Sequence, residues 1–342
     1  MNTQEKVALV ARNTQEIVSV DELSALFEAK DHPHAYIGFA PTGAMHVGHM
    51  IPIRKIVDFL KAGCQFTFLI ADLHAYLDDN KSPWELLDAR FEVYKQSTIG
   101  ILESFGAPLE RVQFVRGSDF EFERSYMENV LQMVGDVTLH RAKRAASEVV
   151  RFKDDPKLGG FVYPLLQIED VYALNADIAL GGIDQRGIYM LGRDLAPRMN
   201  REKYVCVFTP LLPGLTGAKM SSSDASSKIE LLDDEATVRK KVNKAHCPAG
   251  EVEGNGVLAF LEHVIFPLKM DAGEVFVIDR PEKFGGSVSF DSFEALKDAF
   301  VSGELHPADV KQGLARELTL LLGVVQQHLS PDVMSRAYPD GH

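Results

Sequence analysis

Two histidines and a distant lysine have the residue types and the sequence context to bind phosphate groups. His46 and His49 lie in HVGH (46–49), directly after a short apolar run, and Lys219 lies in PGLTGAKMSSSDASSKI (213–229). Histidines three apart share a face at a helix start, beside backbone N–H groups that have no partner within the helix. Such a helix start favours a polyphosphate. HVGH alone would also suit two histidines that cap a surface helix.

The other residues of these two segments fit ATP. Gly48 has no side chain, so a flat ring such as adenine can lie against the backbone. Lys219 would supply a cation to the β and γ phosphates as pyrophosphate leaves, and Ser221 and Ser222 would supply hydroxyl donors. Met220 lies between them and is assigned to the same site. Neither GxGxxG nor the Walker pattern GxxxxGK[ST] occurs.

The elements that must position these residues read as an α/β fold. Continuous apolar runs alternate with helical segments such as 50–63 and 83–105, which predicts a Rossmann-like, doubly wound parallel sheet. A helical insertion is expected at about 121–175. Ligands bind beyond the carboxyl ends of such strands. The expected strands are AYIGFA (35–40), QFTFLIA (65–71), RVQFVRG (111–117), DIALGGIDQ (177–185) and YVCVFTP (204–210).

Length favours two domains, because 342 residues exceed one core of ordinary size. We expect residues 1–232 to form the domain that carries the sheet. Residues 233–342 read as a mainly helical second domain with a short EVFVID strand. Its expected helices lie near 234–246, 255–268, 291–302 and 306–329.

Composition excludes several classes of protein. Three widely spaced cysteines give neither a disulfide framework nor a CxxC metal site, and we expect no protein-bound metal. No run approaches the roughly 18 to 20 apolar residues of a membrane span, and the N-terminus lacks a signal-peptide core, so we expect a cytoplasmic protein. The net charge of −13 speaks against a nucleic-acid coat, although basic residues cluster in LHRAKRAA and VRKKVNK.

HVGH followed by KMSSS resembles the signature pair of class I aminoacyl-tRNA synthetases. The chain is most similar to tyrosyl-tRNA synthetases of the archaeal and eukaryotic cytosolic type, from about residue 11 to AYPD (337–340). The resemblance implies formation of tyrosyl-adenylate from L-tyrosine and ATP with Mg²⁺, then transfer to the 3′-terminal adenosine of tRNA(Tyr). It also implies a homodimer. The matching segments are AYIGF, ADLHAYL, YPLLQIED, GGIDQR, PGLTGAKMSSS, AHCPAGEVEGNGVL and RPEKFGG.

The resemblance also implies a tyrosine pocket. Tyr36 and Asp170 are expected to hydrogen-bond the substrate phenol, and Tyr163, Gln167 and Gln185 to hold its α-ammonium end. Independently of the family, Tyr163, Gln167 and Asp170 fall at i, i+4 and i+7 of YPLLQIED, which is one helical face. A buried phenol requires a donor and an acceptor.

For tRNA, the resemblance places two residues near the acceptor end and makes 233–342 the anticodon-binding domain. Arg144 and Arg186 are expected at the acceptor stem. Gly187 stands where archaeal members carry a lysine, which removes one cation there. Unpaired RNA bases are read by stacking and by hydrogen bonds to their edges. The expected anticodon contacts are Phe284, His306 and Asp309.

Three alternatives remain at this stage. A tryptophanyl-tRNA synthetase shares fold and motifs, but an indole offers only a donor and does not require the Tyr36 and Asp170 pair. A nucleotidylyltransferase for a small metabolite would share HxGH without the anticodon residues. A non-catalytic tRNA-binding paralogue would be expected to lose His49, Lys219 or Asp170, and all three are present.

Overall fold

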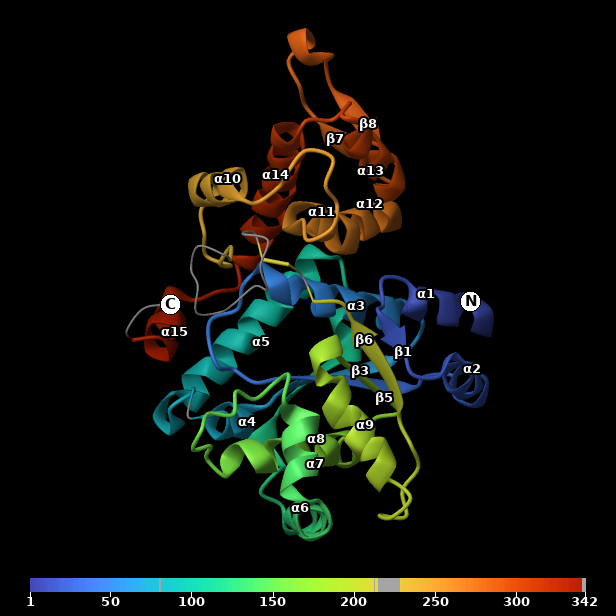
Figure 1. The fold of residues 1–342 in the computed structure, drawn as a ribbon, viewed down its shortest axis with the longest axis vertical. Helices are drawn as coiled ribbons and strands as arrows, with labels where there is room; N and C mark the ends of the chain where they lie inside the picture. The colour runs from blue at the N-terminus through green and yellow to red at the C-terminus, as the bar shows by residue number, and fades with distance from the viewer. Residues whose placement is uncertain (80, 212, 215–227, 340–342) are drawn as a thin grey trace.

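A computed structural model of the chain describes residues 1–79, 81–211, 213–214 and 228–339. A six-stranded sheet forms its centre, in the order β1-β6-β5-β2-β3-β4 (Figure 1). All neighbouring pairs are parallel except β1 with β6. Chain order reverses between β2 and β5, as in a doubly wound fold. The strands are β1 (Glu16–Ile17), β2 (His34–Phe39), β3 (Gln65–Ile70), β4 (Val112–Arg116), β5 (Ile178–Gly182) and β6 (Val205–Thr209).

Helices of the first part of the chain cover this sheet. The prediction of a Rossmann-like parallel sheet is confirmed, and the insertion is present as three helices between β4 and β5. The short antiparallel β1 was not predicted from the sequence. These helices are α1 (Thr3–Ala11), α2 (Val20–Ala29), α3 (Met50–Lys61), α4 (Asp72–Leu77), α5 (Leu87–Ser104), α6 (Arg124–Asp136), α7 (Leu139–Ala146), α8 (Gly159–Ala173) and α9 (Arg186–Leu195).

The second part of the chain is mainly helical. The helix expected near 255–268 is interrupted by a π-helical turn at Leu261–Ile265, and a two-stranded ribbon pairs β7 with β8. Helices α14 and α15 both pack against α5, so the chain returns to the first part at its end. The elements are α10 (Glu235–Lys244), α11 (Gly256–Phe260), α12 (Phe266–Ala272), β7 (Phe276–Ile278), β8 (Val288–Phe290), α13 (Phe293–Ser302), α14 (Pro307–Val325) and α15 (Pro331–Ala337).

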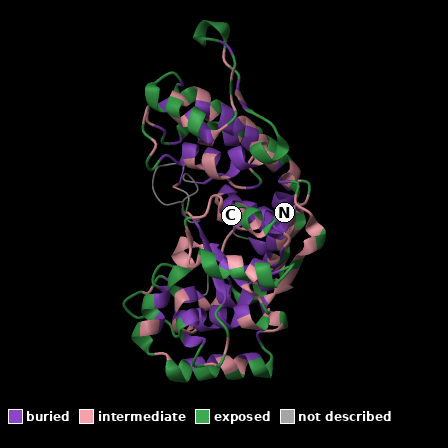
Figure 2. Ribbon diagram, turned by 90° about the vertical axis from the view of Figure 1, so that its right-hand side faces the viewer, coloured by how far each residue is buried: buried purple, intermediate pink, exposed green. Residues whose placement is uncertain are grey.

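One apolar core runs through both parts, and a separate cluster lies inside the insertion. The larger core joins β2, β3, α3 and α5 to α11, α12 and α14. The smaller one is formed by α6, α8 and α9. Figure 2 shows buried residues along the interior of both ends of the molecule. Among the described residues, none of the helices combines the length and the apolar composition that crossing a bilayer requires.

Buried charges connect α3 to α1 and α12. Arg54 pairs with Asp58 one turn along α3 at 2.9 Å and also with Asp271 of α12, while Arg12 after α1 binds Asp271 at 2.8 Å. Lys55 is 3% exposed, and its ammonium pairs with Asp58 at 3.1 Å. Burial lowers the pKa of Lys55 to about 8. The helix that follows HVGH is therefore held by both neighbouring helices.

Gly187 lies where two helices approach each other closely. A Cβ at this position would lie 2.4 Å from the carbonyl oxygen of Ala145, which is backbone and cannot rotate away. Gly187 therefore lets α9 approach α7 closely, as glycine does where backbones meet.

We expect Gly187→Ala to lower the free energy of unfolding by about 1–3 kcal/mol, because the added methyl overpacks the contact with Ala145. Urea denaturation followed by circular dichroism measures this. Gly323→Ala is the matched control, since a Cβ there meets nothing within 4 Å. It should stabilise α14 by up to about 1 kcal/mol. Equal stability of the wild-type chain and Gly187→Ala would contradict the packing argument.

Candidate active site

A cavity of about 380 Å³ opens at the carboxyl ends of β2 and β5, where the chain order reverses. It is the location at which a doubly wound fold binds its ligand. HVGH forms one end of the cavity, and α8 and α9 line the other. The predicted residues that it brings together are Tyr36, His46, Gly48, His49, Tyr163, Gln167, Asp170 and Gln185.

A wider hollow of about 1020 Å³ lies among α2, α6 and the end of α8. Its charged side chains are largely paired with each other: Arg201 binds Glu169 at 2.6 Å, and Lys30 binds Asp177 at 2.6 Å. None of the predicted site residues lines it. The smaller cavity is therefore the candidate active site.

The histidines of HVGH are arranged as neutral hydrogen-bond donors. His46 Nδ1 accepts from the Gly48 backbone N–H at 3.1 Å, and the His46 backbone N–H donates to His49 Nδ1 at 3.1 Å. Burial is the main cause that lowers the pKa of His46 to about 2 and that of His49 to about 4, and the Lys228 ammonium acts in the same direction. His49 Nδ1 also lies 3.1 Å from the His46 carbonyl oxygen, so the acceptor role of Nδ1 is fixed for His46, whose neutral ring carries its proton on Nε2. That N–H is available to an anionic oxygen.

The segment after the serine-rich loop is held against HVGH. The Val47 backbone N–H donates to the carbonyl of Ile229 at 3.0 Å, and His46 forms a β-bridge with Glu230. The buried Lys228 ammonium pairs with Glu230 at 3.0 Å. Ile229 and Glu230 thus pack against HVGH. Of the predicted ATP residues, Lys219, Met220, Ser221 and Ser222 lie outside the described residues.

The other end of the cavity is polar and buried. Tyr36 Oη lies 3.0 Å from Tyr189 Oη, and both side chains are almost fully buried. Asp170 accepts a hydrogen bond from Tyr126 Oη at 2.8 Å. Burial raises the pKa of Tyr36, Tyr189 and Asp170 above their ordinary values. Donor and acceptor groups for a phenol therefore lie at the bottom of this cavity, which Asp170 and both tyrosines line.

Amide groups lie beside the phenolic groups. Gln167 Nε2 donates to Gln185 Oε1 at 3.1 Å, while Gln167 Oε1 has no hydrogen-bond partner among the described residues. A buried carbonyl oxygen of this kind normally accepts a hydrogen bond. It suits an ammonium group of a ligand. Tyr163 is also buried and meets the His74 ring edge-on, at 4.8 Å between ring centres.

Three residues behind Asp170 and Tyr36 were not predicted. Tyr126 lies on the insertion helix α6, Glu121 precedes it, and Tyr189 lies on α9. Tyr189 follows Gln185 by four residues, so one turn of helical spacing could have linked it to the pocket. For Tyr126 and Glu121 no spacing in the sequence connects them to α8. Their proximity depends on how the insertion folds back.

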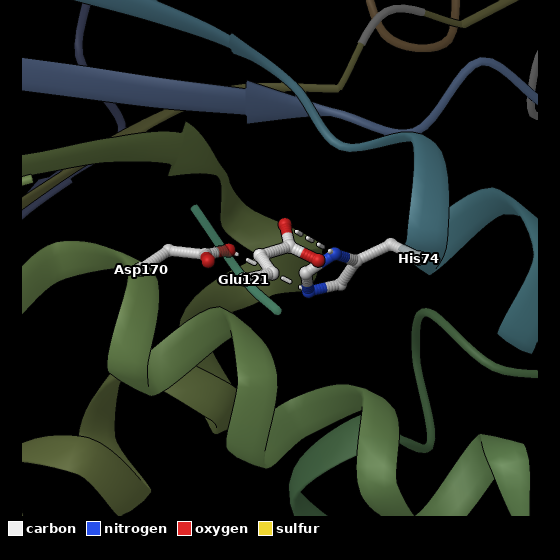
Figure 3. Close-up of side chains that lie close together, drawn as sticks. All are labelled: His74, Glu121 and Asp170. Carbon is white, nitrogen blue, oxygen red and sulfur yellow. Dashed lines mark ion pairs between the residues drawn. The ribbon is translucent and has the colours of Figure 1, made fainter. Parts of the chain in front are cut away.

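His74, Glu121 and Asp170 form a buried cluster at the back of the site (Figure 3). His74 Nδ1 lies 3.6 Å from Glu121, and His74 Nε2 lies 3.5 Å from Asp170. Burial lowers the pKa of His74 to about 4 and raises the pKa of Glu121 well above its usual range. His74 thus contacts Asp170, which was predicted for the site, and Glu121, which was not.

The predicted acceptor-stem residues lie outside the cavity. Arg144 is exposed on α7. Arg186 forms a two-point ion pair with Glu16 of β1, at 2.7 and 2.9 Å. In this state the Arg186 guanidinium is engaged with a carboxylate of its own chain. Among the described residues, the Arg144 side chain takes part in no ion pair.

The predicted anticodon residues lie in the second part of the chain. Phe284 is 60% exposed, on the segment between β7 and β8 that projects from the end of the molecule opposite α6 (Figure 1). His306 caps α14, and its Nδ1 accepts from the Ala308 backbone N–H at 3.1 Å. Asp309 lies 3.8 Å from Arg280, which precedes the Phe284 turn. Arg280 connects this turn to the start of α14, because its Nε also donates to the Gly286 carbonyl at 3.0 Å.

Comparison with known proteins agrees with this arrangement. The family described as tRNA synthetases class I (W and Y) matches residues 28–323. A tyrosine–tRNA ligase of Haloarcula marismortui is 50% identical over 99% of both chains. The chain belongs to the tyrosyl-tRNA synthetases. The structure of a tyrosyl-tRNA synthetase from Archaeoglobus fulgidus complexed with L-tyrosine is similar, with a TM-score of 0.90 and 40% identity over 96% of this chain and all of that one.

A cytoplasmic tyrosine–tRNA ligase of Xenopus laevis is 43% identical over 98% of this chain. The match covers 63% of the Xenopus protein, so the likeness concerns that share of its length. The archaeal and eukaryotic cytosolic resemblance inferred from the motifs is thus matched by relatives of both kinds.

We expect His49→Asn to reduce the loss of stability on acidification. The folded-state pKa of His49, about 4, lies below its unfolded value, so the unfolded chain binds more protons and stability falls as pH decreases below about 6.5. Between pH 7 and pH 5 the free energy of unfolding should therefore fall by about 1–2 kcal/mol more in the wild-type chain than in the variant. Urea denaturation at both pH values measures the difference. Parallel losses in both proteins would contradict the buried neutral state of His49.

Proposed function

We propose that the cavity binds L-tyrosine beside ATP and that the chain joins the two as tyrosyl-adenylate before transfer to the 3′-terminal adenosine of tRNA(Tyr). The activity is that of a tyrosine–tRNA ligase, an aminoacyl-tRNA synthetase, as in relatives that are 40–50% identical over nearly the whole chain. The observation that carries the substrate assignment is the buried Asp170 and Tyr36 in a cavity that HVGH also lines.

Recognition of tyrosine is assigned to the bottom of the cavity. Asp170 would accept the hydrogen bond of the substrate phenol, and Tyr36, whose hydroxyl lies 3.0 Å from Tyr189 Oη, would donate one to it. Phenylalanine would leave both buried groups without a partner, which opposes its binding. Tyr163, Gln167 and Gln185 would hold the α-ammonium end, supported by the unpaired Gln167 Oε1.

Activation is assigned to the two signature segments. The tyrosine carboxylate attacks the α-phosphate of ATP, and pyrophosphate leaves. His46 and His49 would donate from Nε2 to phosphate oxygens, and Gly48 would let adenine approach the backbone. The predicted charge from Lys219 and the contacts from Met220, Ser221 and Ser222 belong to the same step. No side chain acts as a nucleophile, so catalysis is positioning and charge stabilisation.

Mg²⁺ enters this proposal with the ATP phosphates. It prefers phosphate and carboxylate oxygens and keeps several waters, so a nucleotide can bring it without a dedicated protein site. Its chemistry would be to offset charge on the leaving pyrophosphate. We assign no protein ligand to it.

For tRNA we propose a catalytic part at 1–232 and an anticodon part at 233–342. Arg144 would approach the acceptor end, and Arg186 would do so by exchanging Glu16 for phosphate. Phe284 would stack on an anticodon base, because its ring is largely exposed. His306 and Asp309 would bond to base edges. We place this activity in the cytoplasm, as in the relatives whose names carry that word.

We also propose a homodimer through the insertion. On α6, Tyr126, Val130 and Met133 face inward, while Leu131 and Val134 are 62% and 44% exposed on the other side. Two further exposed leucines come from the same region, Leu139 at the start of α7 and Leu158 before α8. Exposed apolar side chains gathered in one region mark interaction sites.

The assay for the proposed function is ATP–pyrophosphate exchange with tyrosine, tryptophan and phenylalanine at equal concentration. We expect exchange with tyrosine alone. Asp170→Asn and Tyr36→Phe should each weaken the use of tyrosine about tenfold or more, because a buried partner of the phenol is lost. Absence of exchange with all three amino acids in the folded protein would instead favour a non-catalytic tRNA-binding paralogue.

The proposed dimer is tested by sedimentation equilibrium. We expect the wild-type chain at twice its chain mass and the Leu131→Glu, Val134→Glu double variant at the mass of one chain, because two buried charges oppose association. Leu320→Glu on α14 is the matched control, since Leu320 is as exposed as Leu131, at 62%. A double variant that still sediments as a dimer would exclude this face as the interface.

A further inference from the structure

The cluster behind the tyrosine site contains a carboxylate that the proposed reaction does not use. Glu121 is fully buried, and neither of its oxygens has a hydrogen-bond partner among the described residues. Neither ring nitrogen of His74 has a hydrogen-bond partner among the described residues. Figure 3 shows the His74 ring facing both carboxylates, with one dashed line to Glu121 and one to Asp170. Groups of this kind are rarely left unsatisfied without a role.

Counting charges limits what the cluster can hold. If Glu121 and Asp170 were both ionised around a neutral imidazole, two negative charges would share a site with 1% exposure or less. Two buried like charges at this separation strongly favour retention of a proton. At neutral pH the cluster therefore keeps at least one proton in addition to the one on the neutral imidazole.

The neighbours decide where the proton resides. Asp170 accepts a hydrogen bond from Tyr126 Oη at 2.8 Å, which favours its ionised form. Glu121 has no such donor. It also faces Asp72, which accepts from Arg116 Nε at 2.7 Å and from Ser118 Oγ at 2.6 Å. A second charge on Glu121 would be repelled from both sides.

We propose that Glu121 is protonated while Asp170 is ionised. His74 lies within reach of both carboxyl groups and couples them through its two ring nitrogens. This inference rests on the proposed role of Asp170 as the acceptor for the substrate phenol. Glu121 would donate its O–H to His74 Nδ1, and His74 Nε2–H would donate to Asp170 Oδ2. Separations of 3.6 and 3.5 Å become hydrogen bonds after a small closing movement. Glu121 is a positioning residue and touches no substrate.

The absence of a side chain at Gly117 leaves space for the Glu121 carboxyl group. A Cβ on Gly117 would lie 2.2 Å from Glu121 Oε1, so only glycine leaves room for the acid. The titratable and charged groups that face the cluster come from every element around it. They are Asp72 on α4, Arg116 on β4, Tyr126 on α6, Tyr163 and Glu169 on α8, and Tyr189 on α9.

The arrangement predicts how tyrosine binding responds to pH. The pKa of Glu121 is raised by burial and by the charges of Asp170 and Asp72, so it loses its proton only as pH rises. Ionised Glu121 would withdraw the donor from His74 and repel Asp170. Tyrosine affinity should therefore fall toward alkaline pH, in excess of any change due to the substrate itself.

The experiment measures tyrosine binding by titration calorimetry from pH 6 to pH 8.5, without ATP and with EDTA present. Glu121→Gln keeps the shape and can still donate to His74, but it cannot ionise. We expect it to match the wild-type affinity at pH 6 and to lack the alkaline decline. Glu121→Met removes the donor, so its affinity at pH 6 should be about tenfold weaker, with poorer discrimination against phenylalanine.

Infrared difference spectroscopy gives a readout that does not depend on binding. The wild-type chain minus Glu121→Gln should contain the carbonyl stretch of a protonated carboxylic acid. Identical pH profiles for the wild-type chain and Glu121→Gln, without that band, would overturn the proposal. So would wild-type affinity that EDTA abolishes and Zn²⁺ restores, since one ligand atom of each residue lies within 4.8 Å of the others and a metal would then hold the cluster.

Asp170→Asn separates this inference from the proposed function. If Asp170→Asn leaves tyrosine affinity unchanged, the tyrosine pocket itself is misassigned. If Asp170→Asn weakens binding while Glu121→Gln behaves as the wild-type chain at every pH, the pocket stands and the proton assignment fails. Should Glu121→Met fail to fold, the pH profile of Glu121→Gln and the infrared band still test whether Glu121 carries the proton.

Discussion

The site depends on one constraint: each polar group buried at its floor needs a partner, because water does not reach it. Tyr36 and Tyr189 share one contact, and Tyr126 supplies a donor to Asp170. These partners come from β2, α9, α6 and α8, which are far apart in the chain. A buried polar group without a partner costs more than a typical hydrogen bond returns. The sheet and the insertion must therefore fold together before the pocket exists.

This requirement gives the insertion a second role. Its exposed face offers apolar side chains to a partner, and its inward face supplies Tyr126 to the substrate site. Glu121 lies at the start of the same segment, 3.6 Å from His74 Nδ1. A change of packing within α6 would thus reach Asp170 through a single hydrogen bond. The proposed association surface and the specificity of the pocket share one helix.

Features encoded by patterns over a few neighbouring residues were predictable from the sequence, whereas contacts between distant residues were not. Continuous apolar runs located the five parallel strands, and the HVGH and YPLLQIED spacings placed their side chains on common faces, because these patterns repeat within a few residues. The contact of Tyr126 with Asp170 joins residues 44 positions apart, and no periodicity encodes such a pairing. The two-residue β1 was missed since so short a strand has no pattern of its own. Gly187 had been interpreted from the family alone, and its packing reason required Ala145 in three dimensions.

The ion pairs around α3 bear on how the molecule comes apart. Asp271 of α12 is shared by Arg12, Arg54 and Lys61, which belong to the first part of the chain. If the second part unfolded alone, the nearly buried Arg54 would lose this carboxylate, and charge left unpaired in an apolar setting is costly. This coupling favours unfolding of the two parts in a single transition.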